Sequence, residues 1–507
     1  MPRQPTRRRE RPREQLANGN PPHRAIPAAP IVGDDVVMQP SPLLEDDSAM
    51  VLSLPTYAET RDSGVEWLGD VPAHWEVRRI KDWLRVNQTV LPEDTDPDYE
   101  FHYIDIGAVQ AGVLVGDPVR MRFGTSPSRA RRVLRGGDTI VSTVRTYLKA
   151  VLHVPAGGDD LVASTGFAVL TPQAATEPAF VGSLCRSQPF TDFVMAQSVG
   201  VAYPAIAETR LSAVPVAIPP LEEQTAIVRF LDYVDRRIRQ YIRAKEKLIA
   251  ALEEQKQAVI HQAVTGQIDV RTGEPYPAYR ESGLDWLPEV PKHWEVRPSR
   301  RVFRPRKELA RSGDTQLSAT QAYGVIAQAE YEAKIGRKVT KITRNLQQRR
   351  HVEVDDFVIS MRSFQGGLER AWRSGCIRSS YIVLQAAVPL NVDYFGRLFK
   401  SRGYIAALQS TANFIRDGQD LSFENFARVH LPFPAPEEQH EIAEAIGRSV
   451  RQASSEIEIS RRRISLLREY SVRLLADVVT GKLDVRGAAV ALPEEEDPLG
   501  HSGRDVA

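Results

Sequence analysis

The sequence predicts an α+β protein in which two mixed α/β domains are joined by two long helices that form an antiparallel coiled coil, with pseudo-twofold symmetry. One observation is a repeat: residues 61–78 recur at 280–297, with 12 of 18 positions identical. Another is a pair of flanking motifs, PPLEEQ at 219–224 and VTGQIDVR at 264–271, which recur as APEEQ at 435–439 and VTGKLDVR at 479–486. The third is an apolar pattern between the motifs of each half, with a period near ~3.5 residues. Solenoid repeats are only ~20–50 residues long, so the chain is a duplicated half-molecule.

Composition limits the class of protein. The 507 residues have room for two to four domains, and 42% hydrophobic with 26% charged residues is typical of a globular protein. No apolar run reaches the ~18 residues that a membrane span needs, and the beginning of the chain has no apolar core of a secretion signal. Two cysteines far apart in the sequence fit a reducing compartment. We therefore expect a cytoplasmic protein without a membrane segment.

The net charge of +1 hides a segregation of charge. Basic residues gather at 120–135, 297–307 and 334–350. Acidic residues gather at 91–100, 219–225, 436–444 and 494–497. A solvated face explains any single basic run, whereas runs in corresponding halves favour a phosphate-binding surface.

The sequence divides at changes of composition and at the repeated motifs. The expected segments are a disordered basic arm at 1–58, a first domain at 59–218, a long helix at 219–266, a second domain at 267–432, a second long helix at 433–481, and a flexible acidic tail at 482–507.

Short β-like runs separated by turn residues predict the sheets of the first domain. They are FHYIDIG at 101–107, DTIVSTVR at 138–145, AVLHV at 150–154 and GFAVL at 166–170, with helical segments expected near 178–196. The second domain repeats this loosely, because DDFVISMR at 355–362 matches the second run and SSYIVL at 379–384 matches the fourth. Middle segments differ while the edges match, as expected for one scaffold with variable loops.

Each long helix carries an apolar stripe that predicts a coiled coil. The first stripe includes Ile227, Leu231, Val234, Ile238, Leu248 and Leu252. The second includes Ile442, Ile446, Ile457, Ile464, Leu467 and Leu474. Two such helices in one chain most simply pair with each other. The alternative is that each helix packs on its own domain.

No convincing catalytic or metal-binding motif is present. His74 and His293 each lie in a His-Trp-Glu sequence without a second ligand at helical spacing, which argues against a metal site. Trp67, Trp75, Trp286 and Trp294 lie in the matching blocks, where we expect them to pack the base of each domain.

Taken together, the repeated motifs resemble the specificity subunit of type I restriction–modification enzymes. The signature is composite: SG-x-x-WL-x-x-VP-x-HWEV opens each half, P-x-x-EEQ opens each helix, and VTG-x-(I/L)-DVR follows it. The resemblance covers about residues 60–487 and includes the segment VGVAYPAI at 199–206. Its counterpart ANFIRDGQDL at 412–421 departs from the family pattern, as does the basic arm.

The resemblance implies a DNA-recognition subunit without catalytic activity of its own. Each target-recognition domain would read one half of a bipartite target in double-stranded DNA, and the helices would set the spacing. Two modification subunits, which are methyltransferases that use S-adenosylmethionine, would dock on the helices. Two restriction subunits, which are translocases and nucleases that use ATP and Mg²⁺, would complete the complex. No cofactor is expected on this chain.

Side chains near strand ends are the candidates for DNA contact, because Arg, Lys and Gln can bind base edges or phosphates and aromatic rings can support distorted bases. In the first domain they are Arg129, Arg131, Arg132, Arg145, Tyr147, Lys149 and Tyr203. In the second domain they are Lys338, Lys341, Arg344, Arg362, Phe364, Gln365 and Arg416. For each of them the alternative is an exposed side chain that touches nothing.

Three other functions fit parts of the pattern. A stand-alone DNA-binding regulator could use the same bipartite geometry, and an orphan specificity subunit would lack restriction partners. A coiled-coil scaffold would not bind nucleic acid, so salt-dependent binding to duplex DNA would exclude it.

Overall fold

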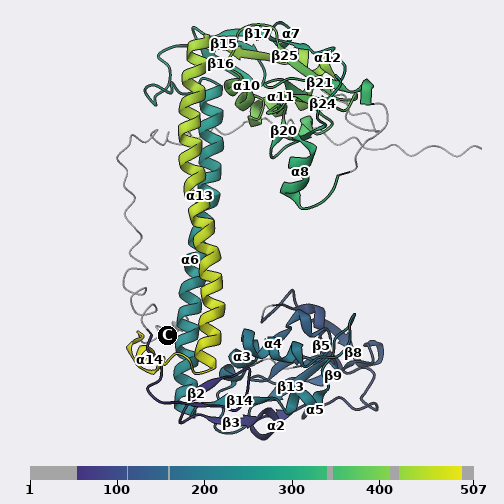
Figure 1. Cartoon of the computed structure of the whole chain (residues 1–507), viewed down its shortest axis with the longest axis vertical. Coiled ribbons are helices and arrows are strands. Elements are labelled where there is room, and N and C mark those ends of the chain that lie inside the picture. Colours follow the sequence, from purple (N-terminus) through teal and green to yellow (C-terminus); the bar gives the residue numbers. More distant parts are fainter. Residues whose placement is uncertain (1–53, 111, 158–159, 340–345, 412–421, 494–507) are drawn as a thin grey trace, which may run out of the picture. The chain divides into compact units, whose positions relative to one another are not determined.

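The computed structural model describes residues 54–493 except 111, 158–159, 340–345 and 412–421 (Figure 1). The described chain forms two compact units that do not follow the expected linear division. The first unit combines residues 54–252 with 454–493, and the second comprises residues 253–453. Each unit therefore contains one α/β domain and parts of both long helices.

The first domain is built on two four-stranded sheets. Its strands are β1 (Thr60–Asp62), β2 (Asp70–Pro72), β3 (Glu76–Arg79), β4 (Arg85–Val86), β5 (Glu100–Ile104), β6 (Val109–Gln110), β7 (Val113–Leu114), β8 (Val119–Arg122), β9 (Ala130–Val133), β10 (Thr139–Ser142), β11 (Val151–His153), β12 (Leu161–Ser164), β13 (Phe167–Thr171) and β14 (Pro215–Ile218). One sheet has the order β11-β10-β13-β4 and is antiparallel throughout. The other has the order β8-β5-β12-β9, in which β5 and β12 are parallel. Three two-stranded pairs, β1–β2, β3–β14 and β6–β7, complete the domain.

Short helices cover the first domain. They are α2 (Ile80–Trp83), α3 (Pro178–Arg186), α4 (Gln188–Ala196) and α5 (Glu208–Ser212). The expected helical segment near 178–196 is divided at Ser187, whose backbone is extended. Pro189 lies in the first turn of α4, where its missing N–H is tolerated, but its ring would clash with the preceding turn of a continuous helix.

The second domain has one four-stranded sheet of order β18-β25-β22-β23 and four two-stranded pairs, β15–β16, β17–β26, β19–β20 and β21–β24. Its strands are β15 (Tyr279–Leu284), β16 (Leu287–Pro291), β17 (Glu295–Pro298), β18 (Phe303–Pro305), β19 (Leu317–Thr320), β20 (Gly324–Ala327), β21 (Arg350–Val352), β22 (Phe357–Ile359), β23 (Glu369–Arg370), β24 (Gly375–Ile377), β25 (Ile382–Ala386) and β26 (His430–Phe433). Its helices are α7 (Ser299–Val302), α8 (Gln328–Ile335), α9 (Ser363–Gly366), α10 (Val392–Leu398), α11 (Arg402–Ser410) and α12 (Phe423–Arg428).

The correspondence expected between the middle strands of the two domains is confirmed. In the first domain β10 pairs with β13 in antiparallel register, and in the second β22 pairs with β25 in the same way. All four strands are rich in buried apolar residues, as expected for strands inside a core.

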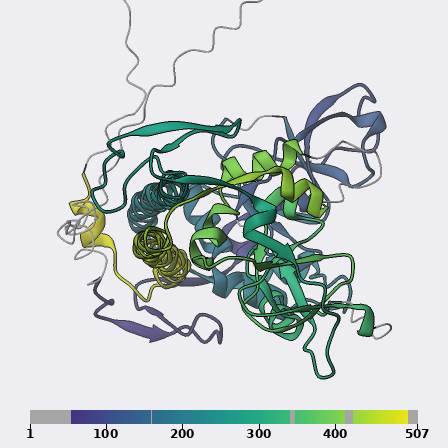
Figure 2. The same cartoon turned by 90° about the horizontal axis from the view of Figure 1, so that it is seen from above.

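The two long helices are α6 (Leu221–Val264) and α13 (Pro436–Val479), and they run side by side (Figures 1 and 2). In the first unit the beginning of α6 packs on the end of α13, because Ile227 and Leu231 share one core with Leu474 and Val478. In the second unit the end of α6 packs on the beginning of α13, where Val264 shares a core with Ile442 and Ile446. The pairing is therefore antiparallel in both units.

The predicted stripe faces the interior of this pairing. Ile227, Leu231, Val234, Ile442, Ile446, Ile457, Ile464 and Leu474 are buried, and Ile238, Leu248, Leu252 and Leu467 are half-buried. The interpretation that each helix packs only on its own domain is therefore wrong.

Both expected boundaries of disorder are wrong where the structure describes them. The arm was expected to extend to residue 58, but Tyr57 is buried in the core of the first unit. The flexible tail was expected from residue 482, but the short helix α14 (Arg486–Ala491) lies within it. Val485, Ala489 and Leu492 are buried in the same core, and their helical spacing explains why the segment is ordered.

The start of each long helix is fastened to its domain by a buried glutamate, and we call this contact the joint. In the first unit the Tyr57 hydroxyl donates to Glu223 over 2.5 Å, and His74 Nε2 lies 2.8 Å from the same carboxylate. In the second unit Tyr276 donates to Glu438 over 2.8 Å, and His293 Nε2 lies 2.9 Å from it.

A glycine directly after each long helix packs closely against a domain. Gly266 after α6 and Gly481 after α13 have φ of 73° and 76°, the left-handed conformation that commonly ends helices. A Cβ at Gly481 would lie 2.3 Å from Pro72 Cδ, and a Cβ at Gly266 would lie 2.4 Å from Pro291 Cδ. The glycine of VTG is thus required by close contact with the repeated Val-Pro of the domain.

We expect Gly481→Ala to lower the free energy of unfolding by roughly 2–5 kcal/mol, because it adds left-handed strain to a clash with a buried proline. Chemical unfolding of the full chain measures the effect. Gly64→Ala is the matched control, since Gly64 has a φ of 68° but no atom within 4 Å of the added Cβ. Equal losses in the two variants would contradict a role for the close contact.

Candidate nucleic-acid interface

Two neighbouring loops, residues 143–149 and 199–205, form one surface of the first domain that we call the loop-pair surface. The 3₁₀ helix η3 (Thr146–Leu148) lies in the first loop. The Ile206 N–H donates to Thr143 O over 2.9 Å, and Thr146 Oγ1 donates to Ser198 Oγ over 2.8 Å. These bonds hold the two loops in a fixed relation.

The loop-pair surface is unusual because it exposes large apolar side chains. Those side chains are Tyr147, Leu148, Val199, Val201 and Tyr203. Contiguous exposed apolar groups on a folded domain are typical of an interaction site. Tyr203 is 66% exposed, and the Arg145 guanidinium lies 5.1 Å from the centre of its ring.

The first loop of this surface also contains backbone strain. Arg145 and Lys149, which flank η3, have φ of 52° and 48°. This left-handed conformation costs roughly 1–2 kcal/mol for a residue with a Cβ. Strain of this kind clusters at sites where function fixes a side chain.

The structure brings together Arg145, Tyr147 and Tyr203 from the sequence-derived candidates. Lys149 lies beside them but forms an ion pair with Asp192. Arg129 is elsewhere and pairs with Asp105 over 3.0 Å.

Arg131 and Arg132 hold positions within the fold. The Arg131 guanidinium lies 4.6 Å from the ring centre of Phe123. Arg132 is only 13% exposed and forms an ion pair with Glu208. Its charge already serves the packing of α5 on the sheet that contains β9.

The candidates in the second domain have mixed outcomes. Arg362 and Gln365 are exposed at α9, and Lys338 is exposed after α8. Phe364 is 2% exposed and belongs to the core of the second unit. The adjacent Ser363 is buried as well, whereas Gln365 is exposed. Lys341, Arg344 and Arg416 lie outside the described residues.

Sequence reasoning missed a cleft beside these residues. Gln321 in the turn between β19 and β20 donates to Arg362 O over 3.3 Å. On the other side of this turn, Tyr323 and Trp372 line a cleft of about 270 Å³. We call it the Trp372 cleft. The signal available in the sequence was a tryptophan between two arginines, Arg370 and Arg373.

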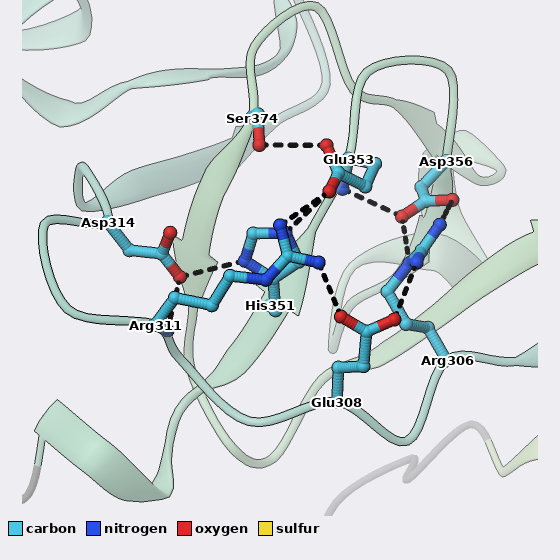
Figure 3. Close-up of polar contacts among 8 residues, drawn as sticks. All are labelled: Arg306, Glu308, Arg311, Asp314, His351, Glu353, Asp356 and Ser374. Atoms are coloured by element: carbon cyan, nitrogen blue, oxygen red, sulfur yellow. Dashed lines mark hydrogen bonds and ion pairs between the residues drawn. The ribbon is translucent and has the colours of Figure 1, made fainter.

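An ion network surrounds the buried His351 of the second domain (Figure 3). His351 on β21 is 1% exposed, and its two ring nitrogens lie 2.8 Å from Asp314 and 2.9 Å from Glu353. Arg311 pairs with Glu353 over 2.9 Å and also with Glu308, while Arg306 pairs with Glu308 over 3.1 Å and with Asp356 over 2.7 Å (Figure 3).

The network shifts the pKa values of His351 and Glu353. Burial alone lowers the pKa of His351, but hydrogen bonds to Asp314 and Glu353 outweigh burial and raise it above its ordinary value. The same contact with His351, with a further hydrogen bond from Ser374, lowers the pKa of Glu353 to about 2. The His351 ring therefore lies between two carboxylates that favour its protonated form.

The position of the network links it to the cleft. Asp314 comes three residues before β19, which leads to the turn with Tyr323. Ser374, whose hydroxyl donates to Glu353 over 3.0 Å, comes directly after Trp372 and Arg373. Both walls of the cleft are thus connected through the network.

The residues that the structure describes contain no group of three or more His, Cys, Asp or Glu side chains arranged to hold a metal ion. None of their helices combines the length and the apolar character that a membrane span requires.

Comparison with known proteins agrees with the resemblance found in the sequence. Residues 72–253 match the family model described as "Type I restriction modification DNA specificity domain". A protein of Methanocaldococcus jannaschii that is named as the type I restriction enzyme MjaX specificity subunit is 21% identical over 453 residues, covering 86% of this chain and all of the relative.

Solved structures share the fold. A chain from a structure of type I R-M complex assembly has a TM-score of 0.62 and 21% identity, and the match covers 82% of this chain and 99% of that one. The HsdS subunit from Thermoanaerobacter tengcongensis has a TM-score of 0.53 and 21% identity over 82% of this chain and 98% of that one. The expected fold class of two α/β domains with paired long helices is therefore confirmed.

We expect the stability of the chain to fall as the pH rises above neutrality. The folded-state pKa of His351 is raised above the unfolded value of ~6.5, so its stabilising contribution is complete below that pH. The contribution is lost as the pH rises through the folded-state value. Urea unfolding of the full chain between about pH 6 and 9 measures it.

His351→Gln should remove this pH dependence. The difference in the free energy of unfolding between wild type and variant should therefore shrink with rising pH. His102→Gln is the control, because His102 is exposed on β5. Parallel profiles for wild type and His351→Gln would show that the ring is not charged in the folded state.

Proposed function

We propose that this chain is the DNA-recognition subunit of a type I restriction–modification system and has no catalytic activity of its own. The observation that carries the proposal is the match of residues 72–253 to the type I restriction modification DNA specificity domain. The fold shared with the HsdS subunit of T. tengcongensis over 82% of the chain supports it.

Each domain would read one half of a bipartite DNA target. The duplicated β10–β13 and β22–β25 frames support this, because they present different loops on similar strands. In the first domain the loop-pair surface offers the exposed Arg145 and two tyrosines. In the second domain the turn at Gln321 and the exposed Arg362 offer comparable chemistry. Arginine and glutamine are side chains that read base edges in the major groove.

The long helices would set the spacing between the half-sites and dock two modification subunits. Ile459 and Leu466 support docking on α13, since they lie seven residues apart on one helical face and are 42% and 47% exposed. S-adenosylmethionine would bind to the modification subunits, and ATP and Mg²⁺ to two restriction subunits. The complex would act in the cytoplasm.

Arg145→Ala should weaken binding to duplexes selected from a random pool by roughly 5- to 100-fold. This is the range expected when a contact with a base edge worth ~1–3 kcal/mol is lost. Fluorescence anisotropy of the full chain at several salt concentrations measures it. A phosphate contact would instead lower the salt dependence by about one counterion at every sequence.

Arg78→Ala is the matched control, because Arg78 is also an exposed arginine of the first domain but pairs with Glu76 on β3. Its DNA affinity should equal that of the wild type. Equal affinities and equal salt dependences in the wild type and both variants would show that the loop-pair surface is not part of the DNA interface.

Co-purification tests the proposed partners. We expect the chain to form a stable complex with a modification subunit co-expressed from the same genome. Ile459→Asp with Leu466→Asp should abolish the complex, because each aspartate would be desolvated at the interface. Val490→Asp is the control, since Val490 on α14 is apolar and 82% exposed. A chain that binds DNA yet never retains a methyltransferase would favour the stand-alone regulator.

A further inference from the structure

We infer that the Trp372 cleft holds a single DNA base that has left the base stack. This inference rests on the proposed function of the chain in DNA recognition. The cleft lies in the second domain and has a volume of about 270 Å³. It is lined by Tyr323, Ile326, Glu330, Lys334, Trp372 and Arg373. It is below the ~300–1,000 Å³ typical of sites for larger ligands.

The walls of the cleft are aromatic rings. Trp372 is 50% exposed and Tyr323 is 40% exposed, whereas the other five tryptophans of the chain are buried or half-buried. An exposed tryptophan on a folded domain forfeits a large burial of apolar surface. Flat aromatic faces open to solvent are the surfaces on which unstacked bases bind.

Both rings are held in place by cations that have other partners. The Arg370 guanidinium lies 4.4 Å from the centre of the Trp372 ring and pairs with Asp355 over 2.6 Å. The Lys334 ammonium lies 5.1 Å from the centre of the Tyr323 ring and 3.8 Å from Glu330. Side chains fixed in this way lose little conformational freedom when a base binds.

The approach of the two walls depends on Gly324. Its φ is 70°, and an added Cβ would lie 2.7 Å from Arg370 O and 2.8 Å from Trp372 Nε1. The backbone N–H of Trp372 also donates to Val325 O over 3.0 Å. The turn between β19 and β20 therefore packs directly on the tryptophan, so the cleft is a built feature of the fold.

The chemistry of the cleft matches the parts of a nucleotide. Ile326 gives the cleft an apolar floor, since it is 4% exposed. The Glu330 carboxylate on the rim is an acceptor for the amino group of a base, as in readout of cytosine. Arg373 is exposed and can bind the phosphate next to that base. The backbone carbonyl of Arg362 accepts a hydrogen bond from Gln321 in the same β19–β20 turn.

Protection of Trp372 from acrylamide quenching provides the test. The full chain is titrated with a mixed-sequence 30-base-pair duplex and with the same duplex carrying one unpaired base. DNA should reduce the quenchable fraction of the tryptophan emission, because Trp372 is the exposed ring. The unpaired base should increase affinity, since a base already outside the stack needs no unstacking. Trp372→Phe removes the exposed emission and identifies its source.

Substitutions separate stacking from charge. Trp372→Ala should weaken DNA binding roughly 5- to 100-fold, the range for loss of one base-stacking contact. It should leave the salt dependence unchanged and abolish the preference for the unpaired base. Trp372→Phe keeps an aromatic face and should stay close to wild-type affinity. Arg373→Ala should instead lower the salt dependence.

The outcomes distinguish this inference from the proposed function. If the wild type binds duplex DNA while Trp372 stays fully quenchable and Trp372→Ala binds equally well, the cleft is not a base site and the proposed function stands. If the wild type binds no duplex even at low salt, the proposed function fails as well. Unfolding midpoints of the variants equal to that of the wild type confirm that the fold is retained.

Discussion

A buried glutamate carboxylate in the first turn of each long helix is the interaction on which the rest of the structure depends. Glu223 and Glu438 are 5% and 8% exposed, and a carboxylate without partners at that depth would be costly. Each domain supplies a tyrosine hydroxyl and a histidine ring as partners. Burial, followed by the bond to Glu223, raises the pKa of Tyr57, so its hydroxyl keeps its proton and remains a donor. The helix can therefore begin only where the domain presents these groups.

The joint explains why three separate motifs are repeated together. Glu438 of the EEQ motif meets His293 of the HWEV motif, and the DVR motif brings Asp269 and Arg271 to the same place. In the second unit one continuous segment, 269–276, connects the last motif to Tyr276. In the first unit the two ends of the described chain make the same connection. The Asp484 N–H donates to Pro55 O over 2.8 Å, and Arg486 lies over the ring of Tyr57.

The features that could be predicted from the sequence are those that depend on local periodicity. The stripes with Ile227 and Ile442 and the strands around 138–145 and 355–362 follow from the spacing of apolar residues. The partners of charged side chains could not be predicted, because they depend on long-range contacts. Arg132 meets Glu208, 76 residues away, and nothing near Phe364 indicates which face of α9 is buried. The helix in the expected tail could have been predicted, since Val485, Ala489 and Leu492 have helical spacing.

The joint and the loop-pair surface are separate, and this has a physical consequence for variation of the sequence. The loop-pair surface is held by backbone hydrogen bonds and by Thr146 and Ser198, none of which is shared with Glu223 or Gly481. Effects of substitutions at sites without shared partners add independently. A loop can therefore change its exposed side chains, with only a local cost in stability, while the helix contacts keep the same geometry. Constant edges and divergent middles in the two halves are the result expected when selection acts on these two sets of contacts separately.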